Sequence, residues 1–173
     1  MKIRFLNLSV KDKSVKKSYE NLFKKFLSKG IFVMGKEVEK FEKKISKNIK
    51  KKYSVGVSSG TNAIYLALKA CGIKRGDHVL VPCLSWLSTF TACKHLGAIP
   101  VGIDINEDLQ INIELIKKNI TRKTKAIIVV HFTGYLKNYD KLKKLCNEKK
   151  IFLIEDAAQS FGARISNKPA GSF

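Results

Sequence analysis

Apolar residues in the first fifty positions recur every third or fourth residue, with Lys and Glu between them. This spacing predicts two amphipathic helices. The first helix ends at Gly30, and its apolar face consists of Val15, Tyr19, Leu22, Phe23, Phe26 and Leu27. The second helix has a narrower apolar stripe, made of Val38, Phe41, Ile45 and Ile49. We expect residues 1–52 to form an N-terminal helical arm whose apolar faces pack against another surface.

From Tyr53 onward, short apolar segments alternate with helical patterns. The apolar segments predict strands at residues 53–57, 79–82, 99–103, 126–132 and 151–156. The stretches between them predict helices at residues 61–71, 86–96, 112–119 and 138–149. Strands that are apolar throughout and alternate with helices are typical of a parallel sheet that is covered on both faces. We therefore predict an α/β fold with three layers and a mostly parallel sheet.

Three segments that follow predicted strands are candidates for a binding site. They are residues 58–63 (SSGTNA), 82–86 (PCLSW) and 155–160 (EDAAQS). In open parallel sheets, ligands bind in the crevice outside the carboxyl ends of the strands. These segments are therefore expected to lie on the ligand side of the sheet.

The formal net charge of +20, from 34 basic and 14 acidic residues, suggests nucleic acid or an anionic membrane surface as a partner. However, 17 of the 34 basic residues lie in residues 1–52, where most of them occupy the polar faces of the predicted helices. The arginines number only four, namely Arg4, Arg75, Arg122 and Arg164. Recognition of base edges and phosphates favours the planar arginine side chain over lysine. We therefore expect no nucleic-acid partner.

The cysteines and the apolar segments exclude several other classes of protein. Cys71, Cys83, Cys93 and Cys146 form no CxxC pair and no cluster with histidine, so the sequence predicts reduced thiols and no metal site. No segment approaches the roughly 20 apolar residues of a membrane span. The first residues lack the continuous apolar core of a signal peptide. We expect a soluble, cytoplasmic protein that has no membrane partner.

The segment Ser58–Ala63 combines small residues with the start of a predicted helix. The first N–H groups of a helix have no partner within the helix, and the helix dipole favours an anion there. The alternative is an ordinary N-cap, since Ser is a preferred capping residue. Neither GxGxxG nor GxxxxGK[ST] occurs in the sequence, which excludes the usual dinucleotide and nucleoside-triphosphate loops. A phosphate bound here would belong to another kind of ligand.

Two adjacent acids, Glu155 and Asp156, end the most apolar predicted strand, and the small residues Ala157 and Ala158 follow them. One acid could pair with a buried pyridinium nitrogen, because an opposite charge favours the protonated form of that nitrogen. Alternatively, both acids belong to a solvated strand end. Trp86, the only tryptophan, also follows a predicted strand. Its ring could cover a flat heterocycle by offset stacking, or it could pack in the core.

These motifs occur in the order that is typical of one enzyme family. The stretches are MGKEVEKFEKKI, VGVSSGTNAIYLALKACGIKRGDHVLVP, LGAIPVGIDINEDLQINIELIKKNITRKTKAIIVVHFTG and IEDAAQSFGARISNKPAGSF. Together they resemble the DegT/StrS-type nucleotide-sugar aminotransferases, a branch of the fold-type I enzymes that use pyridoxal 5′-phosphate (PLP). The resemblance covers nearly the whole chain. It implies the large domain of an aspartate aminotransferase-like fold, with PLP as cofactor.

The resemblance also implies roles for single residues. Gly60, Thr61 and Asn62 correspond to the positions that bind the phosphate of PLP in the family. Trp86 corresponds to the aromatic residue that stacks on the pyridine ring. The family usually has Phe or Tyr at that position, so Trp86 is a departure from its pattern.

Asp156 corresponds to the carboxylate that meets the pyridine nitrogen in the family. Gln159 corresponds to the amide that reaches the phenolic oxygen of the ring. A second departure lies at residues 130–134, where VHFTG replaces the more usual VHLYG. Neither departure removes a residue of the expected cofactor site.

The family continues beyond the GSF that ends this sequence, first to the lysine that forms a Schiff base with PLP and then to a smaller C-terminal domain. We therefore expect the Schiff-base lysine to lie beyond Phe173, so that no catalytic residue falls within this chain. Lys168 precedes GSF and does not match that lysine. Residues 53–173 would then be a partial PLP-binding large domain, whose last strands also lie beyond the sequence.

For function, the resemblance implies transfer of an amino group to a keto group of a nucleotide-linked deoxysugar. Glutamate is the expected amino donor, and biosynthesis of a surface polysaccharide or another glycan is the expected purpose. The full enzyme is expected to be a homodimer, and this chain alone is expected to be inactive. One alternative is a PLP-dependent sugar dehydratase of the same family, in which histidine replaces the lysine. The other alternative is a non-catalytic basic binding protein or a split-gene fragment.

Overall fold

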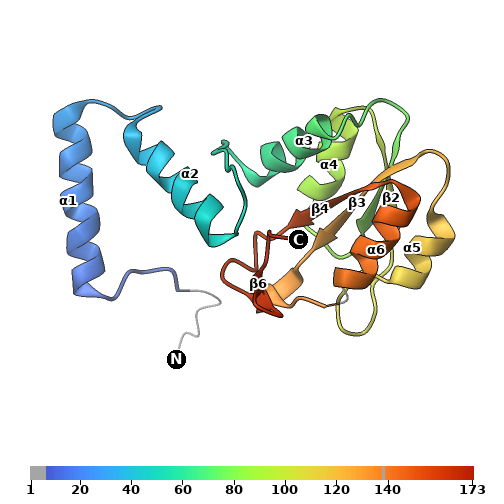
Figure 1. Cartoon of the computed structure of the whole chain (residues 1–173). Coiled ribbons are helices and arrows are strands. Elements are labelled where there is room, and N and C mark those ends of the chain that lie inside the picture. Colours follow the sequence, from blue (N-terminus) through green and yellow to red (C-terminus); the bar gives the residue numbers. More distant parts are fainter. Residues whose placement is uncertain (1–6, 138) are drawn as a thin grey trace. The chain divides into compact units, whose positions relative to one another are not determined.

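The computed structural model describes residues 7–137 and 139–173. The chain divides into two compact units, Met1–Phe41 and Glu42–Phe173, which are described separately (Figure 1). The division falls inside a helix, before the expected end of the arm at residue 52. That boundary rests on the change in sequence pattern and stays a prediction.

The first unit contains α1 (Lys13–Lys29), and the local sequence explains both ends of this helix. The side chain of Asp12 caps the start by accepting the N–H groups of Ser14 and Val15. At the other end, Gly30 adopts a φ of 63° and donates its N–H to the carbonyl of Phe26. A left-handed residue at this position is a common helix stop and favours glycine. The predicted end at Gly30 is therefore confirmed.

The apolar face predicted for α1 contains side chains that remain exposed, among them Val15, Tyr19, Leu22, Phe23 and Leu27. The next helix, α2 (Lys36–Asn48), carries Glu37 and Glu39 in its first turn and Lys47 in its last. This arrangement complements the helix dipole. The last residue of the predicted stripe, Ile49, lies just after the end of α2.

The second unit is built around a four-stranded parallel sheet with the strand order β2-β1-β3-β4. Its strands are β1 (His78–Pro82), β2 (Ile99–Ile103), β3 (Thr124–Val130) and β4 (Phe152–Asp156). The register of β1 against β3 shifts between His78 and Val79. The strands β2 and β4 form the two edges of the sheet, as the strand order shows. Four of the predicted strands are thus confirmed, each within a few residues of its expected bounds.

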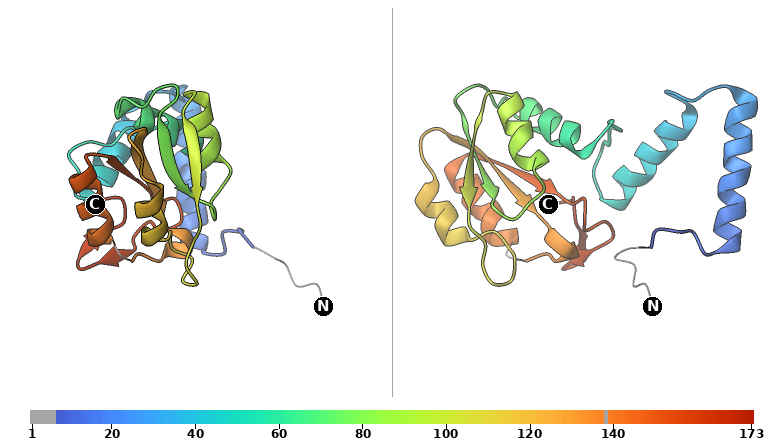
Figure 2. Two further views of the ribbon diagram at one scale, coloured as in Figure 1. Left: turned by 90° about the vertical axis from the view of Figure 1, so that its right-hand side faces the viewer. Right: turned by 180° about the vertical axis from the view of Figure 1, so that it is seen from behind.

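Helices cover both faces of this sheet, which confirms the predicted three-layer α/β fold (Figures 1 and 2). On one face, α3 (Gly60–Ala70) and α4 (Ser88–His95) pack over a core that includes Leu68, Val79, Val81 and Ile128. On the other face, α5 (Ile113–Asn119) and α6 (Tyr139–Lys149) pack over a core that includes Leu80, Ile116, Ile127 and Leu142. Successive residues of β1, β3 and β4 alternate between the two cores, as the period of a strand requires.

The strand predicted at residues 53–57 is wrong. These residues form no ladder, and the side chain of Val55 is 76% exposed. The N–H of Gly56 donates to the carboxylate of Glu42, at 2.7 Å, instead of to a neighbouring strand. An apolar and β-branched segment becomes a strand only when another strand supplies hydrogen-bond partners. No such neighbour flanks these residues in the described part of the chain.

Two further details differ from the predictions. The strand expected to reach residue 132 ends at Val130, and a short 3₁₀ helix, η1 (Phe132–Gly134), follows it. A small antiparallel hairpin of β5 (Arg164–Ile165) and β6 (Lys168–Pro169) was not predicted. Its two turn residues, Ser166 and Asn167, have positive φ angles of 46° and 63°. The predicted helix start at Asn138 lies outside the described residues.

The search for membrane-spanning segments concerns only the described residues. None of their helices is long and apolar enough to cross a membrane.

Candidate functional site

The candidate site lies where the parallel strands of the second unit end. Figure 1 shows the N-terminal end of α3 on the same side as the arrowheads of β3 and β4. The loop after β4 and the loop between β1 and α4 also begin at this side, because all four strands run in parallel. The segments 82–86 and 155–160 therefore lie at the carboxyl ends of β1 and β4, and the segment 58–63, which follows no strand of the described chain, opens α3 on the same side.

The two acids at the end of β4 point to opposite faces of the sheet. Leu153 packs against the core under α5 and α6, whereas Ile154 packs against the core under α3 and α4. Because side chains alternate along a strand, Glu155 belongs to the α5/α6 face and Asp156 to the α3/α4 face. Asp156 thus shares a face with α3, whose first turn is the predicted phosphate site.

Both carboxylate oxygens of Glu155 have hydrogen-bond partners, so this side chain has a structural role. Its Oε2 lies 2.9 Å from Nε2 of His131 and accepts the N–H of Gly171, also at 2.9 Å. Its Oε1 accepts the N–H of Phe173 at 2.7 Å. The side chains of Glu155 and His131 are only 9% and 2% exposed. Glu155 therefore anchors the end of the described chain to the sheet.

Asp156 is half-buried and retains capacity to bind a ligand. Its Oδ1 accepts the N–H of Ala158 at 3.1 Å, and its backbone carbonyl accepts the N–H of His131 at 3.1 Å. Its Oδ2 has no hydrogen-bond partner within the described residues. A carboxylate that is held on one oxygen and open on the other can accept a bond from a ligand without rearranging.

The first turn of α3 is both a capped helix end and an open anion site. The side chain of Ser59 accepts the N–H of Asn62 at 3.2 Å, and the carbonyl of Ser59 accepts the N–H of Ala63. The N–H groups of Gly60 and Thr61 have no acceptor in the part of the chain that the structure describes. A methyl group added at Gly60 would meet nothing within 4 Å, so the space in front of this turn is open. The two interpretations of this segment are therefore compatible.

Trp86 does not pack in the core, because its side chain is 80% exposed. It lies between β1 and α4, and its carbonyl accepts the N–H of Thr89 at 3.0 Å. The neighbouring Ser85 hydroxyl lies 2.6 Å from that of Thr89, which closes the start of α4. The position of the loop is thus fixed while the indole ring remains accessible. Its stacking on a ligand stays a prediction.

Gln159 lies on the loop after β4 and is tied to the turn after β3. Its Oε1 accepts the N–H of Thr133 at 2.9 Å. This partner could not be predicted, because a backbone N–H leaves no signature in the residue type. The burial of His131 could not be predicted either. The one sequence signal near Thr133 and His131 is the departure VHFTG, which contains both.

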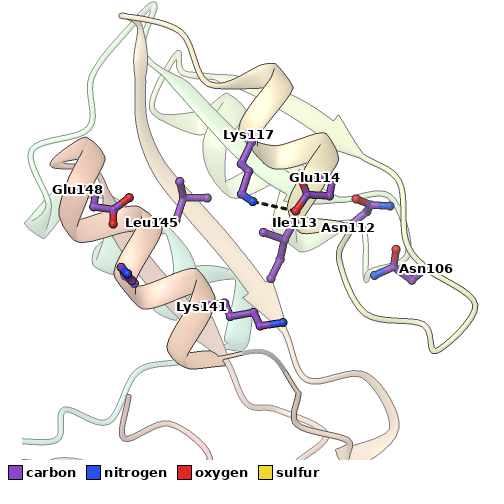
Figure 3. A pocket seen from close by; sticks show the side chains of 9 residues that line it. Asn106, Asn112, Ile113, Glu114, Lys117, Lys141, Leu145 and Glu148 are labelled. Atoms are coloured by element: carbon purple, nitrogen blue, oxygen red, sulfur yellow. Dashed lines mark hydrogen bonds and ion pairs between the residues drawn. The ribbon is translucent and has the colours of Figure 1, made fainter.

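A separate pocket lies outside the predicted site, between α5 and α6 (Figure 3). It is an open groove of about 580 Å³, lined by Asn106, Asn112, Ile113, Glu114, Lys117, Lys141, Lys144, Leu145 and Glu148. Glu114 and Lys117 form an exposed ion pair within it, at 2.8 Å. None of the residues predicted to bind PLP lines this groove.

Most of the cysteine thiols are at least partly buried, which lowers their reactivity. Cys93 and Cys146 are buried, and burial raises the pKa of each thiol to about 11. Burial also raises the pKa of Cys71, whereas Cys83 is exposed. Thiols with raised pKa values are poor nucleophiles near neutral pH. Within the described residues, no group of three or more His, Cys, Asp or Glu side chains could hold a metal ion.

Comparison with known proteins gives consistent results. The DegT/DnrJ/EryC1/StrS aminotransferase family matches residues 13–173. The chain is 37% identical over 140 residues to the GDP-perosamine synthase of Vibrio cholerae, a match that covers 80% of this chain and 38% of that protein. It is 31% identical over 172 residues to the dTDP-3-amino-3,4,6-trideoxy-alpha-D-glucose transaminase of Streptomyces venezuelae, which covers 99% of this chain and 45% of that protein.

A solved structure agrees with these matches. The GDP-4-keto-6-deoxy-D-mannose-3-dehydratase of E. coli with bound hydrated PLP matches with a TM-score of 0.84 and 34% sequence identity. The match covers 95% of this chain and 43% of that one. This chain therefore spans less than half the length of the relatives that it matches. The family match extends over nearly all of the sequence, and the chain belongs to the DegT/DnrJ/EryC1/StrS aminotransferase family.

Proposed function

We propose that this sequence forms the PLP-binding part of an enzyme that transfers an amino group from glutamate to a keto group of a nucleotide-linked deoxysugar. One observation carries the proposal. Among the described residues, the N–H groups of Gly60 and Thr61 and the Oδ2 of Asp156 have no hydrogen-bond partner, and they belong to the same face and the same end of one sheet. These groups match a phosphate and a protonated ring nitrogen, the two charged ends of PLP.

The residues at this end of the sheet fit the cofactor. The N–H groups of Gly60 and Thr61 would hold the phosphate, since helix N-termini favour anions. Asp156 would accept a hydrogen bond from the pyridine nitrogen. Gln159 retains its Nε2 donor for the phenolic oxygen, and the exposed ring of Trp86 would cover the pyridine face.

The charge of Asp156 sets the chemistry that this site would support. A carboxylate beside the pyridine nitrogen favours the protonated, positively charged form of the ring. When bound, PLP supplies an electron sink that stabilises negative charge at the carbon that carries the amino group. The half-buried position of Asp156 strengthens its interaction with the ring, because less water screens it.

The lysine that moves the proton in this family has no match in the sequence. Lys168 lies on β6, where its side chain is 56% exposed and its Nζ is 3.9 Å from Asp140. Its exposed position gives no support for a cofactor role. We therefore assign no catalytic residue to this chain and expect it to be inactive alone.

Partners and location are also part of the proposal. The exposed apolar side chains of α1 support a homodimer or another surface that covers them, because exposed apolar clusters mark interaction sites. The scarcity of arginine argues against a nucleic-acid partner. We propose a cytoplasmic enzyme of surface polysaccharide or glycan biosynthesis, the role in which amino sugars of this kind are consumed.

A dehydratase is the second candidate function. The observation that favours it is the match to the E. coli dehydratase, at 34% identity over 95% of this chain. Its identity to this chain is similar to that of the transaminase relative, so the 173 residues do not separate the two reactions.

The two reactions are distinguished by their products. The experiment expresses the complete product of the gene that encodes this sequence and supplies PLP, glutamate and a nucleotide-linked 4-keto-6-deoxysugar. Amino transfer yields an amino sugar and one 2-oxoglutarate for each molecule formed, whereas dehydration yields a sugar that has lost a hydroxyl group and contains no added nitrogen. Mass spectrometry of the sugar product decides between them. If neither product formed in a PLP-loaded protein, the proposed function would be wrong.

A further inference from the structure

The turn that follows β3 holds the side-chain amide of Gln159. The N–H of Thr133 in η1 donates to Oε1 of Gln159 at 2.9 Å, across 26 residues of sequence. Gly134 also lies close to Gln159. A methyl group added at Gly134 would lie 3.3 Å from the carbonyl oxygen of Gln159. The turn and the loop after β4 therefore fit closely at this point.

The turn adopts a backbone conformation that its sequence disfavours. Thr133 has a φ of 57° and a ψ of 15°, in the left-handed region. A β-branched residue there is a rare outlier, and such strain is worth on the order of 1–3 kcal/mol. Local hydrogen bonds offset part of it, because the Thr133 hydroxyl donates to the carbonyl of Phe132 at 2.7 Å and the N–H of Gly134 donates to that of His131. Such strain is often found at functional sites.

The contact with Thr133 decides how the amide of Gln159 is turned. A backbone N–H can only donate, so the atom that faces it must be the amide oxygen and not the nitrogen. The orientation therefore follows from chemistry and not from an assignment of similar atoms. The two hydrogens of Nε2 are then directed away from the turn and are available to a ligand.

We propose that the N–H of Thr133, held at positive φ and supported by Gly134, is a positioning group that makes Gln159 a hydrogen-bond donor toward its ligand. The inference rests on the proposed function, in which the ligand atom is the phenolic oxygen of the cofactor ring. A donor that is fixed in advance favours the ionised form of that oxygen. The turn thus selects an oxygen anion at this position.

The test uses pyridoxamine 5′-phosphate, which carries the same ring oxygen but cannot form an imine with the many surface lysines. Gln159→Glu keeps an oxygen for the N–H of Thr133 but removes the donor. We expect it to bind pyridoxamine 5′-phosphate at least about tenfold more weakly, the loss typical of a charge-assisted hydrogen bond. Gly134→Ala should weaken binding as well, because its new methyl group displaces Gln159.

Thr133→Asn is the matched control. It retains the backbone N–H and tolerates positive φ better than threonine, so it should bind the ligand as tightly as the unaltered chain and unfold at equal or higher urea. Two further measurements separate positioning from a general loss of structure. Hydrogen exchange at the Thr133 N–H should remain slow in Gln159→Glu and become fast in Gln159→Ala. The ring hydroxyl of the bound ligand, followed by its absorbance, should ionise at higher pH in Gln159→Glu.

The outcomes distinguish this inference from the proposed function. No binding of pyridoxamine 5′-phosphate to the unaltered chain would overturn both. Binding that is equally tight in the unaltered chain, Gln159→Glu and Gly134→Ala would overturn the positioning role alone. If Thr133→Asn weakened binding as much as Gln159→Glu does, the threonine side chain rather than its N–H would carry the effect, and the inference would also fail.

Discussion

Glu155 and Asp156 are adjacent in sequence but differ in their hydrogen-bond partners and in the face of the sheet to which they point. The residue pattern marked both acids as candidates, the family resemblance implied a role for Asp156 alone, and the alternation along β4 places the two on opposite faces of the sheet. Asp156 faces the α3 side, and its Oδ2 has no partner among residues 7–137 and 139–173, whereas Glu155 is buried against His131 and two backbone N–H groups. The partners of Glu155 could not be predicted, because they lie 16 to 24 residues away and include bare backbone atoms.

Matched amide substitutions should separate these two acids. Glu155→Gln should lower the free energy of unfolding by roughly 2–3 kcal/mol, because the amide nitrogen that replaces one oxygen cannot accept the N–H of Gly171 or Phe173. Asp156→Asn should change the unfolding free energy little, since its partner is a single N–H. In the complete enzyme, it should retain much of the cofactor binding while the half-reaction with glutamate collapses. Urea unfolding and stopped-flow absorbance measure the two effects, and an unchanged half-reaction in Asp156→Asn would refute its assignment.

The buried thiols give a prediction that depends on pH. Burial raises the pKa of Cys93 and Cys146 from 9.0 to about 11. At pH 8, Cys83 should therefore react quickly with a disulfide reagent, while these two should react only after unfolding. Between pH 9 and 11 the unfolded chain loses thiol protons that the folded chain keeps. The free energy of unfolding should thus fall as pH rises through this range. Rapid labelling of Cys93 in the native chain would contradict the described core.

At the scale of elements, hydrophobic periodicity predicted the helices and strands whose formation depends on local sequence. It failed for segments whose structure depends on a neighbouring strand or on a turn. The helices and the four paired strands followed from their patterns, and Gly30 marked a helix end. Residues 53–57 have the composition of a strand, but no strand in the described part of the chain pairs with them. The hairpin at β5 and β6 depends on left-handed residues at Ser166 and Asn167, and only Asn favours that conformation. The ends of elements near the site were thus the least predictable.

The first turn of α3 should reveal its role through opposite effects on stability and binding. Ser59→Asp keeps a capping oxygen and adds a negative charge near the positive end of the helix dipole, so unfolding should require equal or higher urea. The same charge repels a phosphate at the N–H groups of Gly60 and Thr61. Affinity for pyridoxamine 5′-phosphate should fall about tenfold or more. Ser59→Asn, which caps without charge, is the control; parallel losses of affinity in both variants would indicate that charge is not the cause.

At the scale of the whole molecule, we propose cofactor-binding residues in this sequence, and none of its lysines matches the one that holds the cofactor covalently in the family. Incubation with PLP followed by borohydride should therefore produce slow, scattered labelling of exposed lysines. Mass spectrometry should detect no stoichiometric adduct at one defined position. Because most lysines in the described residues are exposed, the label should increase with PLP concentration without saturating at one per chain. A single saturating adduct, at Lys168 or elsewhere, would show that the chain has its own cofactor lysine.

If the cofactor binds at the carboxyl ends of the strands, an NMR titration of the labelled chain will locate it there. At 19.5 kDa, the ¹⁵N-labelled chain suits assigned NMR spectra during titration with pyridoxamine 5′-phosphate. We predict that saturable shifts will concentrate at the N–H groups of Gly60 and Thr61, the indole N–H of Trp86, the Ala158 N–H beside Asp156, and the side-chain amide of Gln159. Shifts confined to the groove between α5 and α6, or spread evenly over exposed lysines, would contradict a cofactor site at the carboxyl ends of the strands.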